Sequence, residues 1–258
     1  MDLFSPVKKR GGTTTLYMKA TPALRGEPAD VVYDGDGLRG VFSGGQAMRF
    51  LGCDTAEVAY AVPTGPDAFK RQQKIGGPLW QAYLDDPLAA GRWPAFTQPL
   101  HPLVEARLAA ATGPGSALNH AHHADRARSA LIAMILDDRV RLGIAPADFR
   151  LFVAVTHEVF DGYGRLLAFL NTSVADAASR PALTYNERMI ENGMAAPFFI
   201  WPNTDPFIGR PAVTDAALPP ARLRKAAAVG KHGRSRQAAA AARAAGLGIH
   251  DPAGPLRL

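Results

Sequence analysis

The residues whose types and spacing could do chemistry gather in the stretch 34–57, which reads DGDGLRGVFSGGQAMRFLGCDTAE. Asp36 lies near its start and Asp54 near its end, and Gly44 and Gly45 lie between them. A hairpin that turns at these glycines would bring the two carboxylates together. Neighbouring carboxylates repel each other, and a hard cation such as Ca²⁺ or Mg²⁺ relieves that repulsion. The stretch therefore predicts a metal site with oxygen ligands.

Two further charged residues flank the second aspartate. Arg49 precedes Asp54 in the sequence, and Glu57 follows it after Thr55. A guanidinium group binds phosphate oxygens well, and a carboxylate can take a proton from water. Together with a cation, these groups predict a site for phosphate esters.

The elements that must position these residues are short strands and separate helices. Strands are expected at 28–33, 38–42, 46–53, 151–155 and 165–170. Helices are expected at 78–84, 103–110, 121–142, 184–192, 221–229 and 235–245. This order indicates an α+β fold rather than a βαβ repeat. Five short strands also suit a small closed barrel of the oligonucleotide/oligosaccharide-binding (OB) type, although composition by itself does not select that barrel.

The clearest helical pattern spans 121–142. Its apolar residues fall on one face, which is expected to pack into the core: Ala127, Leu131, Met134 and Ile135. Asp138 is expected on the opposite, exposed face. Farther on, Thr184 followed by Glu187 predicts a capping box at the start of a short helix.

The chain divides into an arm, a main domain and a tail. The arm is 1–27, the domain is 28–250 with an insertion at 61–119 and an added segment at 205–233, and the tail is 251–258. Proline and glycine recur through the insertion, which predicts short helices and loops. Its aromatic residues are expected to pack it down, with a protein-partner surface as the alternative: Trp80, Tyr83, Trp93 and Phe96.

Composition sets broad bounds on partners and location. The chain has 258 residues with a net charge of +6, which favours polyanionic partners such as nucleic acid. A single cysteine, Cys53, excludes an internal disulfide framework. No run reaches the length of a membrane span, so no membrane partner is expected. The first residues lack the apolar core of a secretion signal, which makes cytoplasmic synthesis the default expectation and non-standard export the alternative.

The charged residues resemble, in order and in spacing, a pattern of the staphylococcal nuclease (thermonuclease) family. The matching segments are Asp34-Gly35-Asp36, Arg49, Asp54-Thr55, Glu57 and, far downstream, Asp161-Gly162-Tyr163-Gly164-Arg165. Further similarity at 186–195 and 236–249 extends the resemblance to about half of the chain. One departure is Gly37, where the family commonly carries threonine.

The resemblance implies a five-stranded OB-fold-type β-barrel with flanking helices. It also implies a Ca²⁺-dependent endonuclease that cuts DNA and RNA alike and leaves 3′-phosphate ends. One Ca²⁺ would be held by Asp36, Asp54 and the backbone carbonyl of Thr55. Contacts to phosphate groups are blind to base sequence, so little sequence specificity is expected.

Four further residues receive roles from the chemistry of phosphodiester hydrolysis. Arg49 and Arg165 would clamp the phosphate as two planar forks. Glu57 would accept the proton of the attacking water or position that water. Tyr163 could hydrogen-bond or pack on the substrate's phosphate or sugar. Asp161 is expected to shape its turn and has no place in the catalytic set.

Two alternatives stay open on the same residues. The first is a nucleic-acid-binding or scaffold module that keeps the barrel without turnover. The second is a phosphodiesterase for a small nucleotide, with the insertion 61–119 closing the cleft.

Overall fold

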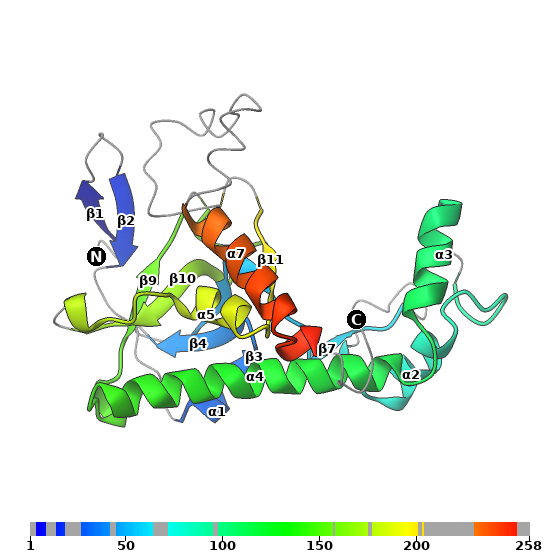
Figure 1. The fold of residues 1–258 in the computed structure, drawn as a ribbon, viewed down its shortest axis with the longest axis horizontal. Coiled ribbons are helices and arrows are strands. Elements are labelled where there is room, and N and C mark those ends of the chain that lie inside the picture. The colour runs from blue at the N-terminus through cyan, green and yellow to red at the C-terminus, as the bar shows by residue number, and fades with distance from the viewer. Residues whose placement is uncertain are drawn as a thin grey trace.

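The computed structural model describes residues 4–8, 14–18, 27–41, 45–63, 72–94, 98–156, 158–174, 177–200, 203 and 230–251. These residues form a mixed α+β fold, as the pattern of strands and helices predicts. A large sheet lies at the centre, and a long helix runs below it and extends past it (Figure 1).

The main sheet contains seven strands in the order β1-β2-β9-β10-β5-β4-β3. Their bounds are β1 (Phe4–Lys8), β2 (Thr14–Met18), β3 (Val32–Asp34), β4 (Gly37–Val41), β5 (Gly45–Phe50), β9 (Leu151–Ala154) and β10 (Leu166–Thr172). β3, β4 and β5 form an antiparallel meander. β10 runs parallel to β5 and antiparallel to β9, so it joins the N-terminal meander to the later part of the chain.

The sheet is open in the part of the chain that the structure describes. Its edges are β1 and β3, and none of its described pairs joins β3 to β9. The closed five-stranded barrel is therefore not confirmed. Two smaller pairs lie beside the main sheet: β6 (Gly52–Asp54) with β11 (Ala196–Phe198), and β7 (Ala59–Ala61) with β8 (Gln72–Lys74).

Both faces of β10 are covered, and the strand is buried along its whole length. Leu166, Ala168 and Leu170 belong to the main core. Leu167 and Phe169 belong to a smaller cluster. Because successive side chains of a strand point to opposite faces, the two clusters lie on the two sides of the sheet.

The helices are α1 (Pro28–Val31), α2 (Pro78–Asp85), α3 (Pro102–Ala111), α4 (Ser116–Arg141), α5 (Tyr185–Glu191) and α7 (Gly230–Ala244). Short 3-10 turns lie at η2 (Pro146–Asp148), η3 (Ala177–Ser179) and η5 (Gly248–His250). No helix in the described part of the chain is both long and apolar enough to cross a membrane. The predicted helix at 221–229 lies outside the described residues.

α4 buries the face that the sequence predicts: Ala127, Leu131, Met134 and Ile135. The prediction for Asp138 is wrong, because this residue is buried as well. Its Oδ2 accepts hydrogen bonds from Nη2 of Arg188 at 2.6 Å and from the hydroxyl of Thr172 at 3.0 Å. A buried carboxylate is tolerated when such partners replace its water, and periodicity alone cannot show that they exist.

The prediction of a strand at 28–33 is also wrong for the first part of that range. Residues 28–31 form α1, and the strand starts at Val32. Pro28 suits the first helical turn, where a missing N–H costs nothing. Arg128 of α4 donates to the carbonyl oxygens of Ala29 at 2.5 Å and Val32 at 3.0 Å. This contact between distant segments outweighs the β preference of the local valines.

The insertion forms helices α2 and α3 close to their predicted places, at one end of α4 (Figure 1). The rings of Trp80 and Tyr83 meet edge to face with centroids 5.6 Å apart, and those of Tyr83 and Trp93 at 5.1 Å. Phe96 lies outside the described residues. Neither α2 nor α3 fully buries any of its residues, and these ring contacts join α2 to the segment that follows it. A protein partner for this insertion stays a prediction.

α5 begins with the predicted capping box of Thr184 and Glu187. The chain leaves the helix through Gly193, whose φ of +67° lies in the left-handed region. The backbone N–H of Ile249 donates to the carbonyl oxygen of Gly193 at 2.9 Å. A Cβ on Gly193 would lie 2.3 Å from the carbonyl oxygen of Leu247. Only glycine therefore permits the C-terminal segment to approach α5 this closely.

We expect Gly193→Ala to lower the free energy of unfolding by more than about 2 kcal/mol, because left-handed strain and a backbone clash add together. Urea unfolding at 25 °C measures the loss. Gly143→Ala is the matched control, since Gly143 has a φ of +64° with nothing within 4 Å of an added Cβ. The free energy of unfolding of the control should fall by only about 1–2 kcal/mol, which is the cost of the backbone strain alone. Equal losses in the two variants would contradict the close approach.

Candidate active site

Three neighbouring strands bring the predicted catalytic segments to one place. Gly37 of β4 pairs with Arg49 of β5, and Arg49 pairs in turn with Leu167 of β10. Asp36 immediately precedes β4, and Asp54 ends β6. The register of the sheet therefore sets Asp36 beside Arg49, although thirteen positions separate them in the chain.

A bend after β5 carries the chain from the main sheet to β6. Gly52 adopts a φ of +77°, and a Cβ there would lie 2.8 Å from the ring of Phe199. β6 then pairs with β11 instead of continuing β5. The predicted single strand at 46–53 is thus two strands, and the break aims the segment that follows β6 at the side chain of Arg49.

Arg49 is the centre of the site. Its Nη1 lies 2.8 Å from Oδ1 of Asp36 and 3.6 Å from Oε1 of Glu57, and its Nη2 hydrogen-bonds to Asp54. The backbone N–H of Thr55 donates to Oδ2 of Asp36 at 3.0 Å. The side chain of Asp36 is only 1% exposed, whereas those of Asp54 and Glu57 are 43% and 40% exposed. The cluster thus has a buried floor and a rim that is open to solvent.

Asp34, at the end of β3, adds a further carboxylate to this cluster. Its Oδ1 is buried and has no hydrogen-bond partner among the described residues. A Cβ on Gly37 would lie 2.6 Å from this oxygen. The glycine that departs from the family pattern therefore leaves room for the side chain of Asp34. The threonine of that pattern would not fit here unless Asp34 moved.

Several carboxyl groups of this cluster have raised pKa values. Burial raises the pKa of Asp36 to about 8, although the Arg49 guanidinium acts in the opposite direction. Burial also raises the pKa of Asp34 and of Glu57 above their usual values. In this part of the described structure, four carboxylates outnumber the two nearby guanidinium groups. Carboxyl groups crowded together in this way favour the binding of a cation.

Arg165 comes to the same end of the sheet. It precedes Leu167 by two residues, and Leu167 pairs with Arg49, so the two arginines project from the same face. Although burial raises the pKa of Asp34 and Glu57, the positive charge of Arg165 acts on both in the opposite direction. Arg165 is therefore near enough to the carboxylates to interact with them electrostatically.

The direct contacts of Arg165 are with its own turn. Its Nε lies 2.6 Å from Oδ2 of Asp161, and its guanidinium lies 5.4 Å from the centre of the Tyr163 ring. Asp161 also accepts hydrogen bonds from the backbone N–H groups of Tyr163 and Arg165, both at 2.9 Å. Asp161 thus shapes the turn, as predicted, and additionally orients Arg165. Tyr163 is exposed, which leaves its ring accessible to a large molecule.

His120 of α4 also lies at this site, although its position in the sequence predicts no role there. Its Nε2 lies 3.1 Å from the backbone carbonyl oxygen of Glu57, so Nε2 must be the donor. Burial lowers the pKa of His120, which favours the neutral imidazole. The contact ties the Glu57 loop to the long helix. No motif signals it, because the acceptor is a main-chain oxygen that any residue type would offer.

The donor set suits a hard cation, but the ligands do not converge in this structure. Among the described residues, no group of three or more His, Cys, Asp or Glu side chains is placed to hold a metal ion. Arg49 binds both Asp36 and Asp54. The partnerless buried oxygen of Asp34 and the surplus carboxylates nevertheless fit Ca²⁺ chemistry. An ion between Asp36 and Asp54 would require Arg49 to release at least Asp54.

A comparison of the chain with models of protein families finds no match, and no curated protein matches it. The candidate active site is therefore defined by its own residues and their geometry.

We expect Arg49→Met to cost about 3 kcal/mol of unfolding free energy, because it strips the central cation from a partly buried acidic cluster. Urea unfolding at pH 7 and low salt measures the loss. Arg39→Met is the matched control, since Arg39 is an exposed arginine of β4 that lies over the ring of Tyr33. The control should change stability by less than about 1 kcal/mol. Equal effects would show that the cluster does not depend on Arg49.

Proposed function

We propose that this protein is a Ca²⁺-dependent, sugar-nonspecific endonuclease that hydrolyses phosphodiester bonds of DNA and RNA, as the resemblance to the staphylococcal nuclease family implies. The observation that supports the proposal is the network around Arg49. Asp36, Arg49, Asp54 and Glu57 match the family pattern in the sequence, and they are in direct contact in the fold. A coincidental motif would have no reason to converge in space.

Asp36, Asp54 and the backbone carbonyl of Thr55 are the groups that would hold the ion. When bound, Ca²⁺ would supply positive charge to a phosphate oxygen and lower the pKa of a bound water molecule. Asp36 is the most rigid of these ligands, because it is buried and the Thr55 N–H holds its second oxygen. Asp54 lies at the open rim and can change partners with little desolvation cost.

Arg49 and Arg165 would bind the phosphate from two neighbouring strands. Arg49 would exchange a carboxylate for a phosphate oxygen, a swap between two charge-assisted hydrogen bonds of similar strength. Asp161 accepts a hydrogen bond from the Nε–H of Arg165. The N–H groups on the two Nη atoms of Arg165 would donate to the phosphate oxygens of the substrate. Planar forks held in this way stabilise the extra negative charge of the transition state.

Glu57 would accept the proton of the attacking water, or position that water for attack. Burial raises the pKa of its carboxyl group, which makes the carboxylate a stronger base at neutral pH. Its side chain is half-exposed, so water can reach it. His120 holds the backbone of this residue and thereby limits where the carboxylate can move. By the resemblance, the product carries a 3′-phosphate.

We further propose that β3, β4, β5, β10 and β9 correspond to the five-stranded OB-type barrel of that family. The antiparallel meander and the parallel pair of β5 with β10 support this correspondence. Closure would require β9 to pair with the first strand of the meander.

The second candidate function is a nucleic-acid-binding module that lacks turnover. The position of Arg49 favours it, since this side chain binds both of the carboxylates that would hold the ion. A module of this kind would retain DNA through its basic surface and would need no calcium.

We expect the wild-type protein to nick supercoiled plasmid in Ca²⁺ and to lose this activity in a chelator. Asp36→Asn should abolish nicking, whereas Asp137→Asn, on an exposed position of α4, should not change it. Calcium at about 100 times its Kd should add about 2.7 kcal/mol of stability to the wild type and not to Asp36→Asn, as thermal unfolding would show. Calcium-independent retention of DNA without cutting would instead support the binding module.

We expect Glu57→Gln to lower kcat at least about 100-fold, because the amide cannot accept a proton. The Kd for a single-stranded oligonucleotide should change less than threefold, since Glu57 makes no attractive contact with phosphate (roughly RT ln 3, below 1 kcal/mol). Single-turnover kinetics and fluorescence anisotropy separate the two quantities. Glu105→Gln, an exposed position of α3, is the control. Unchanged turnover in Glu57→Gln would remove this residue from the mechanism.

A further inference from the structure

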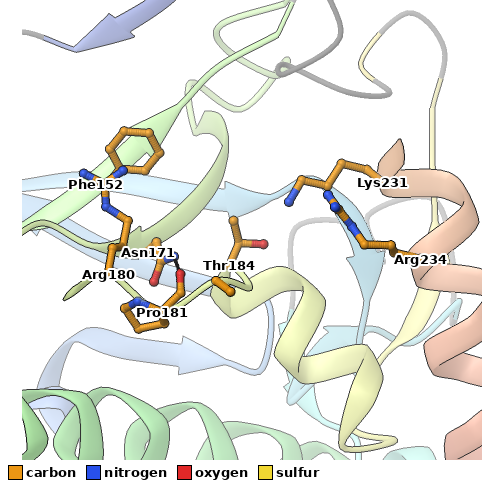
Figure 2. A pocket seen from close by; sticks show the side chains of 8 residues that line it. Phe152, Asn171, Arg180, Pro181, Thr184, Lys231 and Arg234 are labelled. Atoms are coloured by element: carbon orange, nitrogen blue, oxygen red, sulfur yellow. Dashed lines mark hydrogen bonds between the residues drawn. The ribbon is translucent and has the colours of Figure 1, made fainter. Parts of the chain in front are cut away.

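A basic pocket of about 390 Å³ lies between the sheet and the start of α7 (Figure 2). One wall comes from β9, β10 and the loop after η3, and the other comes from α7. Its charged lining residues are Arg180, Lys231 and Arg234. The volume falls within the range of small-molecule sites, which runs from about 300 to 1,000 Å³.

This pocket shares a sheet face with the candidate active site but lies farther along β10. Leu167 pairs with Arg49, and Asn171, which lines the pocket, follows on the same face four residues later. Four residues of extended strand span about 13 Å. Phe169 and its apolar cluster lie between the two positions. The two sites are therefore separate.

The wall beside the sheet is held in place by stacking and buried hydrogen bonds. The guanidinium of Arg180 lies 4.0 Å from the centre of the Phe152 ring, a cation–π contact that orients it. The buried amide of Asn171 donates to the carbonyl oxygens of Pro181 at 2.7 Å and Leu183 at 3.2 Å. The loop that carries Arg180 is thereby fixed to β10, so this cation has a defined position.

On the opposite wall, two cationic side chains form ion pairs with a single buried carboxylate. Lys231, only 4% exposed, hydrogen-bonds through Nζ to Oε2 of Glu187. Nε of Arg234 lies 3.3 Å from Oε1 of the same residue. Figure 2 shows the Lys231 side chain extended toward Thr184, across from Arg180. Burying an ammonium group is costly, and the ion pair with Glu187 offsets part of that cost.

The charged groups that line the pocket are cations of two kinds. Arg180 and Arg234 supply guanidinium groups and Lys231 supplies an ammonium group, and Glu187 forms ion pairs with Lys231 and Arg234. Two guanidinium forks and an ammonium group are suited to the several oxygens of a phosphoryl group. A phosphomonoester carries a charge of about −1.5 to −2 at neutral pH. A carboxylate or an internal phosphodiester carries only a single negative charge.

We propose that this pocket is a binding site for a phosphomonoester group, formed by Arg180, Lys231 and Arg234. The proposal is independent of the nuclease function, because none of these residues belongs to the Arg49 cluster. The same chemistry could come from a small phosphorylated molecule of nucleotide size or from the terminal phosphate of a nucleic-acid strand.

Calorimetric titration with inorganic phosphate tests the site, and backbone amide shifts in NMR spectra locate it. We expect phosphate to shift the amides of Asn171, Thr184 and Lys231, and to bind at least about tenfold more tightly than acetate or dimethyl phosphate. Arg180→Gln and Arg234→Gln should each weaken phosphate binding about tenfold. Arg236→Gln, an exposed position on the same helix, should leave it unchanged.

Three results would overturn the proposal: pocket amides that do not shift, equal affinity for acetate, or unchanged binding in both arginine variants. Circular dichroism checks that each variant is folded. Glu57→Gln should bind phosphate at the pocket like the wild type, so failure of the nuclease proposal is distinguishable from failure of this one. Tighter binding of a mononucleotide than of a terminally phosphorylated oligonucleotide would identify a small-molecule site, and the reverse order would identify a strand-end site.

Discussion

The candidate active site depends on the positive charge of Arg49, which stabilises the carboxylates around it. Its guanidinium contacts Asp36, Asp54 and Glu57, which come from separate segments, and a buried carboxylate is stable only with such a partner. The pairing of β4 with β5 delivers Asp36, and the bend at Gly52 delivers Asp54. The same interaction is therefore a structural support and, in the proposed function, the point at which an incoming cation or phosphate would exchange with it.

β10 organises the rest of the molecule around this cluster. It is the central strand that pairs in parallel with β5, and one of its faces extends from the acidic cluster to the basic pocket. Several carboxyl groups lie near its start, and cationic side chains lie near its end. The apolar cluster of Leu167 and Phe169 separates the two, which limits direct neutralisation of one by the other. A single strand thus supports two sites of opposite charge.

The helices that the sequence predicts are those whose signals are local. The periodic apolar face of α4 and the capping box of α5 form as expected, since both depend on residues one or two turns apart. The failures share a different cause. Asp138 is buried because Arg188 reaches it, and Arg128 holds the helical segment 28–31 through the carbonyl oxygen of Ala29. These partners are distant in the chain, and no local pattern contains them.

The sequence by itself determined the α+β class, most element positions and the candidate residues Asp36, Arg49, Asp54 and Glu57, because residue type and short-range spacing carry that information. Tertiary structure alone decided that Arg49 holds all three carboxylates, that Asp34 occupies the space left by Gly37, and that His120 holds the Glu57 loop. It also created the basic pocket, whose cations come from 180 and from 231–234. Strand register and helix docking bring such residues together, and neither is encoded in any short stretch of chain.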